Sequence, residues 1–291
     1  MPYTVGGGFT ALLEDLNLTT TQKATAEGRV SHLVTYFTNN ITCAELPFKI
    51  GSYERGTVIR WRRDIDVMVA LHYATYKARY DDDSAGMLRW LRDQLNTEYG
   101  DTTVSTKQVA IRMALGDGLQ VDLVPTFPRS GGGYLMPDGS GGWRSTNPPF
   151  HAAAMSRANV DLDLELKPLV RVMKAWNDSN SHHLQSFHLE MMVWEMWHNE
   201  KALPALPQAV SDTLRKGVTW MKYPMSDPWL DAPNRAIYTY LSSDERGVVE
   251  RLFEADHKRA EEALAHDRAG KTKEAFERWG TVFVGRFPSY G

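Results

Sequence analysis

Two segments in which apolar and polar residues alternate constrain the fold of this 291-residue chain most strongly. The first covers residues 64–71, and its odd-numbered positions are all apolar. The second covers residues 108–127 and is interrupted by Gly116-Asp117-Gly118, which predicts a hairpin. Alternation with a period of two is typical of β-strands that place one face on a hydrophobic core. These segments therefore predict a β-sheet in the first half of the chain.

Helical periodicity surrounds and follows this sheet. Thr19 to Thr21 offer an N-cap for a helix that ends near Thr38, after a loose N-terminus, and residues 85–98 also have helical spacing. Residues 128–149, with six glycines and four prolines, are expected to form a long irregular loop or connector. From Leu162 onward the pattern is helical, with the helices expected at residues 166–176, 187–197 and 243–267.

These elements predict an α+β fold with two lobes. We expect a mixed sheet with helices in residues 1–160 and a helical C-terminal lobe in residues 161–291. No apolar run approaches the ~20 residues that cross a bilayer, and the N-terminus has no secretory pattern. Cys43 stands alone, which excludes an internal disulfide and a cysteine-rich zinc site. We therefore expect a cytoplasmic protein without membrane partners.

The charge of the chain bears on its partners. The formal net charge is −3, whereas a protein that binds duplex nucleic acid usually presents a basic face. The dense basic cluster of the sequence is Arg60, Arg62 and Arg63, and such a cluster on a loop is usually solvated or steers small anions. Duplex nucleic acid is therefore a disfavoured partner.

Three aspartates on the alternating segments carry the candidate chemistry. Asp64 and Asp66 are two residues apart, so a strand would present both carboxylates on one face. Asp122 lies on the second segment and would converge with them if the two strands are neighbours. The carboxylates repel each other, and a hard cation such as Mg²⁺ would explain their clustering. The alternative is that Asp64 and Asp66 are two solvated residues on an exposed face of the sheet.

A glycine-serine pair upstream suggests a phosphate site. Gly51 and Ser52 stand just before a helical turn, where glycine lets the backbone approach a phosphate and the serine hydroxyl can bind it. Gly56 would let the chain turn back toward Asp64. A Gly-Ser pair alone is most often a simple turn, but the order Gly-Ser, Gly-Thr, Asp-x-Asp and a later strand aspartate is much more specific.

The stretch from Gly51 to Thr57 (Gly-Ser-Tyr-Glu-Arg-Gly-Thr), with Asp64, Asp66 and Asp122, resembles the signature of polymerase-β-type nucleotidyltransferases. Within that superfamily the chain is most similar to the bacterial CD-NTases, relatives of cyclic GMP-AMP synthase and oligoadenylate synthase. The resemblance implies a nucleotidyltransferase core in which the three aspartates bind the metals. It also implies that Asp122 helps to activate the attacking hydroxyl and that Gly51 and Ser52 hold the triphosphate.

The resemblance continues in the helical half of the chain. Residues 169–177 are similar to the family helix whose lysine reaches the triphosphate, here Lys174, and Lys167 and Arg171 share its helical stripe. Such a stripe can also be a solvated basic face. Residues 186–190 (Ser-Phe-His-Leu-Glu) resemble the family's Ser-Tyr-His-Leu-Glu stretch. This implies that Ser186 contacts phosphate and that Phe187 stacks on a base, an interaction worth roughly 1–3 kcal/mol.

The resemblance also implies cofactors and partners. Two Mg²⁺ ions, for which Mn²⁺ can substitute, would serve nucleoside triphosphate substrates. The zinc-binding cysteines of the animal sensor are absent, as Cys43 alone shows, which argues against direct activation by duplex nucleic acid. A regulatory protein partner is expected, and Gly291 is a candidate for conjugation because some bacterial members are attached to a target through a terminal residue.

Three hypotheses about function follow. The first is synthesis of a cyclic di- or trinucleotide second messenger from nucleoside triphosphates, in bacterial antiphage signalling. The second keeps the chemistry but transfers one nucleotide to a macromolecule, as a toxin-like or tRNA-directed enzyme does; the net charge disfavours it. The third is an inactive nucleotide-binding protein, and the intact set of Asp64, Asp66 and Asp122 argues against it.

Overall fold

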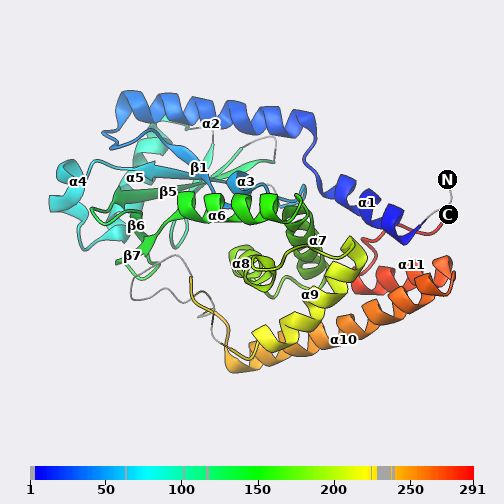
Figure 1. Cartoon of the computed structure of the whole chain (residues 1–291). Helices are drawn as coiled ribbons and strands as arrows, with labels where there is room; N and C mark the ends of the chain where they lie inside the picture. Colours follow the sequence, from blue (N-terminus) through cyan, green and yellow to red (C-terminus); the bar gives the residue numbers. More distant parts are fainter. Residues whose placement is uncertain are drawn as a thin grey trace.

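The protein has two lobes that share one continuous chain (Figure 1). The structure, a computed structural model, describes residues 4–62, 64–100, 102–115, 118–223, 225–227, 237 and 240–291. The first lobe is built around a β-sheet with helices, and the second is helical (Figure 1). The α+β fold expected from the sequence is therefore confirmed.

The sheet has the strand order β1-β2-β5-β4-β3, and a small hairpin of β6 and β7 continues from the end of β5. Only the pairing of β2 with β5 is parallel among the strand pairs of the described residues. The predicted hairpin is the antiparallel pair β4–β5. The strands are β1 (Phe48–Ile50), β2 (Ile65–Ala70), β3 (Thr103–Thr106), β4 (Ile111–Ala114), β5 (Gln120–Pro128), β6 (Tyr134–Pro137) and β7 (Trp143–Thr146).

One face of the sheet packs against helices. The long helix α2 (Thr20–Asn40) runs beside the sheet, and α5 (Ser84–Glu98) packs into the same core (Figure 1). The odd-numbered residues of β2 lie in this core, as their alternation predicts. Thr19 forms a capping box with Gln22, which fixes the predicted start of α2.

The even-numbered residues of β2 lie on the other face of the sheet. Met68 and Ala70 are buried there with Tyr134, while Phe48 and Ile50 pack against them. Asp66 precedes Met68 on this face. The sheet therefore buries apolar residues on both sides away from the aspartates, and the polar part of β2 is confined to its beginning.

The second lobe is a helical bundle with its own large core. Trp176 stacks on Phe253 with ring centroids 4.6 Å apart, and both are fully buried, as expected of tryptophans at helical spacing. α6 crosses in front of the sheet and leads into this bundle (Figure 1). Its helices are α6 (Pro148–Asp161), α7 (Leu166–Ser179), α8 (Ser186–Trp197), α9 (Leu206–Trp220), α10 (Ser243–Arg268) and α11 (Thr272–Val282).

Two parts of the chain differ from the sequence-based expectation. The N-terminal segment is not loose but forms α1 (Val5–Leu16), capped by Thr4, because its apolar side chains pack into the helical core. Residues 128–149 are not irregular, since β6 and β7 pair within them. Gly139 and Gly141, with φ +89° and +105°, lie in the turn between β6 and β7, and glycines of this kind are as typical of irregular loops as of tight turns. Gly116 and Asp117 lie outside the described residues.

Helix α1 packs with the helical lobe and not with the sheet. Although α1 precedes the sheet in sequence, it contributes to the core formed by α7 to α11. We therefore propose that the lobe of residues 161–291 folds together with α1, and the boundary near residue 160 stays a proposal. Within the described residues, none of the helices combines the length and apolarity needed to cross a membrane.

The docking of α1 gives a stability prediction. Phe9 is 1% exposed and packs edge-on against Trp279 and Phe287, with ring centroids 4.9 and 5.0 Å away. We expect Phe9→Ala to lower the free energy of unfolding by about 3–5 kcal/mol, because it leaves a cavity among these rings. Urea denaturation followed by circular dichroism measures the change. Leu46→Ala is the matched control, since Leu46 is 64% exposed and should tolerate truncation.

Candidate active site

The three predicted aspartates meet at the centre of the sheet. In the parallel pairing of β2 with β5, Asp66 lies directly beside Asp122. Neighbouring residues in register point to the same face, so both carboxylates leave the sheet on the side away from α2 and α5. Asp64 lies immediately before β2. The strand adjacency on which their convergence depended is therefore confirmed.

Arg112 lies among these carboxylates. β4 pairs with β5 so that Arg112 is opposite Asp122. Its Nε donates to Asp122 Oδ1 over 2.7 Å, and its Nη2 lies 2.5 Å from Asp122 Oδ2 and 3.4 Å from Asp64 Oδ2. Within the part of the chain that the structure describes, no three carboxylate, histidine or cysteine side chains are arranged to hold a metal ion. The carboxylates of Asp64 and Asp122 instead face the guanidinium.

The electrostatics of the aspartates follow from this arrangement. Desolvation, and then the neighbouring Asp122, raise the pKa of Asp66 to about 7, against the opposing charges of Arg55 and Lys174. Desolvation also raises the pKa of Asp64, although Arg112 opposes the shift. The hydrogen bonds to Asp122 raise the pKa of Arg112, which keeps its guanidinium charged. The Asp66 carboxylate receives no hydrogen bond from the described residues, so its negative charge lacks a direct partner.

The donor atoms of these residues suit a hard divalent cation, although Arg112 occupies the space between Asp64 and Asp122. The donors are carboxylate oxygens, which Mg²⁺ and Mn²⁺ prefer. A nearby cation would stabilise the ionised form of Asp66 and remove the cost of its desolvation. Asp64, Asp66 and Asp122 are therefore the residues that would hold such an ion.

The predicted phosphate turn lies against Asp66. β1 pairs with β2 so that Ile50 is opposite Asp66, and α3 (Gly51–Arg55) begins at the next residue. Gly51 has φ +69°, and a Cβ at this position would lie 1.9 Å from Asp66 Oδ2. The turn closes at Gly56, with φ +71°, and the Thr57 amide donates to the Ser52 carbonyl over 2.9 Å. Ser52 is thus held on the turn beside the aspartates.

A buried ion network links this turn to the helical lobe. Glu190 of α8 is 0% exposed and accepts from Arg55 Nε over 2.8 Å and from the Thr57 hydroxyl over 2.6 Å. Lys174 Nζ of α7 donates to its other oxygen over 2.9 Å and to the Thr57 carbonyl over 3.0 Å. Burial opposes ionisation of Glu190, but Arg55 and Lys174 outweigh it and lower its pKa.

The placement of Lys174 differs from a free, phosphate-facing lysine. Its side chain is 4% exposed, and its ammonium is held by Glu190. The rest of the predicted basic stripe is also engaged, since Lys167 donates to Ser156 and Arg171 donates to Asn17. The stripe therefore ties α7 to its neighbours, and a contact of Lys174 with the triphosphate stays a prediction.

Ser186 and Phe187 begin α8 and are both half-buried. The guanidinium carbon of Arg55 lies 5.3 Å from the Phe187 ring centroid, and the His151 ring centroid lies 5.1 Å from it. Because Arg55 also binds Glu190, Phe187 is coupled to the phosphate turn. Its role in base stacking stays a prediction, as does the contact of Ser186 with phosphate.

The described arginines of the cluster before β2 form ion pairs with aspartates of the same chain. Arg60 pairs with Asp15 of α1, and Arg62 pairs with Asp178 of α7. Arg63 lies outside the described residues. The two described arginines connect the loop before Asp64 to helices through ion pairs, while their side chains stay 37% and 44% exposed.

Sequence reasoning did not find three residues of the site, namely Arg55, Arg112 and Glu190. Arg112 had a signal, because it is a charged residue on the alternating strand that runs toward Asp122. Arg55 and Glu190 stand inside the two stretches that carry the family resemblance. Their contact joins residues 135 positions apart, and no local pattern predicts it.

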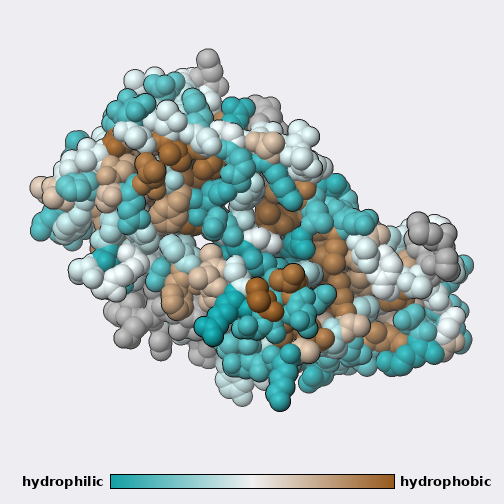
Figure 2. All heavy atoms as spheres, turned by 45° about the horizontal axis from the view of Figure 1, so that its top comes forward, coloured by the Kyte–Doolittle hydropathy of each residue, from teal (hydrophilic) through white to brown (hydrophobic). Residues whose placement is uncertain are grey.

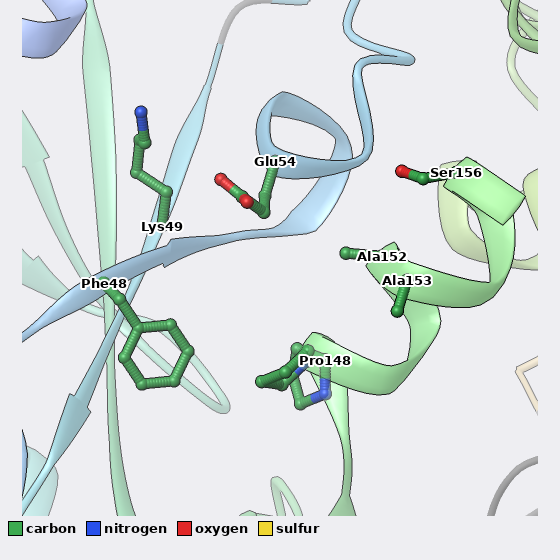
Figure 3. A pocket seen from close by; sticks show the side chains of 8 residues that line it. Phe48, Lys49, Glu54, Pro148, Ala152, Ala153 and Ser156 are labelled. Atoms are coloured by element: carbon green, nitrogen blue, oxygen red, sulfur yellow. The ribbon is translucent and has the colours of Figure 1, made fainter.

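The surface is hollowed between the two lobes (Figure 2). A separate pocket of about 340 Å³ lies between β1, α3 and α6, where the Phe48 ring points toward Pro148 (Figure 3). None of the predicted nucleotide-site residues lines this pocket.

Comparison with known proteins agrees with this geometry. Residues 4–159 match the Second Messenger Oligonucleotide or Dinucleotide Synthetase domain. The chain belongs to this synthetase family. A probable cyclic nucleotide synthase of Bacillus cereus is 24% identical over 277 residues, which cover 82% of this chain and 81% of the relative. A cyclic AMP-AMP-AMP synthase of an Acinetobacter species is 27% identical over 260 residues, covering 83% and 72%.

Other relatives agree in sequence and in fold. An Escherichia coli protein named CBASS oligonucleotide cyclase CdnC is 25% identical over 154 residues, covering 50% of this chain and 48% of the relative. A structure of Escherichia coli CdnC with HORMA-deltaN superposes with a TM-score of 0.80 at 17% identity, covering 97% of this chain and 98% of that one. The expected CD-NTase family, fold and nucleotidyltransferase class are therefore confirmed. Enzymes of this family use divalent metals.

The raised pKa of Asp66 gives the synthetase a pH-dependent stability. Between about pH 4 and pH 7 the folded protein retains a proton that the unfolded chain releases, so metal-free stability falls as the pH rises through this range. We expect Asp66→Asn to raise the free energy of unfolding in EDTA at pH 8 by at least about 1 kcal/mol. The gain should vanish toward pH 4. Thermal unfolding across this pH range measures it, and the exposed Asp82→Asn is the control.

Gly51 gives a second prediction. We expect Gly51→Ala to weaken Mn²⁺ binding at least about tenfold, because the new Cβ would displace the Asp66 carboxylate and strain a positive φ. Isothermal titration calorimetry measures the affinity. Gly28→Ala is the matched control, since Gly28 lies in α2 with no atom within 4 Å of the added Cβ. It should leave Mn²⁺ affinity unchanged and raise stability by about 1 kcal/mol. Equal Mn²⁺ affinity in the two variants would contradict the prediction.

Proposed function

We propose that this synthetase makes a cyclic di- or trinucleotide second messenger from nucleoside triphosphates. The observation that carries the proposal is the placement of Asp64, Asp66 and Asp122 beside the Gly51-Ser52 turn, in a chain of this family. The carboxylates would hold the divalent cations that neutralise the negative charge of the triphosphate. The turn lets the backbone approach a phosphate closely. A macromolecular acceptor such as tRNA is disfavoured because it would favour a basic groove, whereas the formal net charge of the chain is −3.

The transfer step assigns a role to each group. A ribose hydroxyl oxygen forms a bond to the α-phosphorus of the donor, the bond to the β-phosphate oxygen breaks, and pyrophosphate leaves. We assign acceptance of the hydroxyl proton to Asp122, in line with the family resemblance. Ser52 and the Gly51 backbone would hold the triphosphate, Lys174 would add positive charge behind the turn, Ser186 would contact phosphate, and Phe187 would stack on a base.

We propose that Asp64, Asp66 and Asp122 hold two Mg²⁺ ions, for which Mn²⁺ can substitute. Such ions neutralise charge on the triphosphate and lower the pKa of a bound hydroxyl. The protein's own part is to place three carboxylates on one sheet face, with Gly51 allowing the phosphates to approach Asp66. A second transfer within the linear product would close the ring.

We place the product in antiphage signalling, since one relative is named a CBASS oligonucleotide cyclase. A regulatory protein partner is part of this proposal, because the CdnC neighbour was solved with HORMA-deltaN. Conjugation through Gly291 is a further part. Phe287 is anchored in the helical core and Tyr290 lies against Phe276, while Gly291 is exposed. Mass spectrometry of protein isolated from its host would detect a conjugate, and unmodified Gly291 throughout would count against it.

One assay tests the proposed reaction. The purified protein is incubated with each radiolabelled nucleoside triphosphate and Mg²⁺ or Mn²⁺, with and without its host lysate as a source of activator, and then treated with phosphatase. We expect a phosphatase-resistant product, because a cyclic oligonucleotide has no terminal phosphate. Asp64→Ala combined with Asp66→Ala should reduce this product at least about a thousandfold, through loss of the metal ligands.

The outcomes separate the candidate functions. A labelled RNA or protein in place of the small product would support transfer to a macromolecule. Absence of any labelled product with every nucleotide and activator would support an inactive nucleotide-binding protein. Asp82→Asn changes an exposed aspartate outside the three-aspartate site, and this control should retain full activity. Activity that survives loss of Asp64 and Asp66 would show that the metal assignment is wrong.

A further inference from the structure

Arg112 is placed among the catalytic aspartates by the backbone. The β4–β5 register sets Arg112 opposite Asp122, so its guanidinium approaches from the neighbouring strand and not from a mobile loop. Both oxygens of Asp122 are engaged, by Nε over 2.7 Å and by Nη2 over 2.5 Å. A two-pronged contact of this kind between a guanidinium and a carboxylate is stronger and more directional than a single charged hydrogen bond.

The same guanidinium also reaches a second aspartate. Nη2 of Arg112 lies 3.4 Å from Asp64 Oδ2, so one nitrogen atom bridges the carboxylates of Asp64 and Asp122. The Arg112 side chain is 27% exposed and that of Asp122 is 13% exposed, so solvent screens the pair only in part. These carboxylates are the only hydrogen-bonding partners of the Arg112 guanidinium among the described residues.

A divalent cation and this contact compete for the same oxygens. An arginine keeps its charge at any pH a protein tolerates, so it cannot leave by losing a proton. A metal ion bound by Asp64 and Asp122 would face a full positive charge a few ångströms away, which is strongly unfavourable. The guanidinium therefore has to move off Asp122 when the ion arrives, and it then needs another anion.

We propose that Arg112 is an internal counter-ion that holds Asp64 and Asp122 in the nucleotide-free protein and is exchanged for a divalent cation when a nucleoside triphosphate binds. The triphosphate supplies the anion that the released guanidinium requires. The metal ion and the nucleotide therefore bind cooperatively. Free metal binds poorly by itself, because it has to break the Arg112 contact without compensation. This inference rests on the proposed function, since it takes the aspartates as the metal ligands.

The test measures Mn²⁺ binding to the full-length protein by electron paramagnetic resonance, with and without a non-hydrolysable ATP analogue. In the wild type, we expect the analogue to tighten Mn²⁺ binding strongly. In Arg112→Gln, nucleotide-free Mn²⁺ binding should tighten at least about tenfold, and the analogue should add little. The melting temperature of Arg112→Gln in EDTA should fall and should recover on addition of Mn²⁺, because the ion replaces the lost positive charge.

Controls separate this inference from the proposed function. Arg92→Gln breaks an ion pair with Asp93 on α5 and should bind Mn²⁺ like the wild type. Mn²⁺ binding unaffected by Asp64→Ala with Asp66→Ala would refute the metal assignment itself. If that double variant loses Mn²⁺ while Arg112→Gln binds it no more tightly than the wild type, only the counter-ion proposal is overturned. Should Arg112→Gln not fold, Arg112→Met, which also removes the charge but keeps an unbranched side chain, is judged by the same criterion.

Discussion

The parallel pairing of β2 with β5 is the constraint on which the candidate site depends. It sets Asp66 beside Asp122, and the antiparallel strands on either side then bring in the remaining groups. β1 delivers Gly51 against Asp66, and β4 delivers Arg112 against Asp122. A shift of one residue in the pairing of β2, β5 or β4 would turn Asp66, Asp122 or Arg112 to the face of the sheet that packs against α2 and α5. The hydrophobic alternation that stabilises the sheet thus also determines the chemistry of its centre.

Much of the fold could be predicted from periodicity. α2, α5 and the helices of the second lobe follow their apolar spacing, and the hairpin of β4 and β5 follows its alternation. α1 was missed because its glycines resemble a flexible terminus, although its apolar residues bury themselves against helices more than 150 residues away. β6 and β7 were missed because glycine and proline mark turns as readily as irregular loops.

The sequence predicts the site residues that belong to a single patterned segment, but not the contacts between residues that are far apart in the chain. The aspartates lie on strands whose period could be read, and Gly51-Ser52 has a backbone conformation that glycine favours. The contacts of Lys174 could not be predicted from the sequence, because helical periodicity shows which face of α7 carries the lysine but not which residue it contacts. That partner, Glu190, is brought in by the packing of α8 against α7. The sequence therefore predicts the reactive groups better than the residues that hold them.

The buried contacts of Glu190 have a mechanical consequence. Its carboxylate takes hydrogen bonds from the end of α3, from Thr57 and from α7, and all of these groups are shielded from water. Separating α3 from α8 would leave buried charges without partners, at a cost of about 3–5 kcal/mol. The Glu190 contacts therefore hold the two lobes together at this point. We therefore expect the contact between α3 and α8 to stay fixed while nucleotides bind and leave.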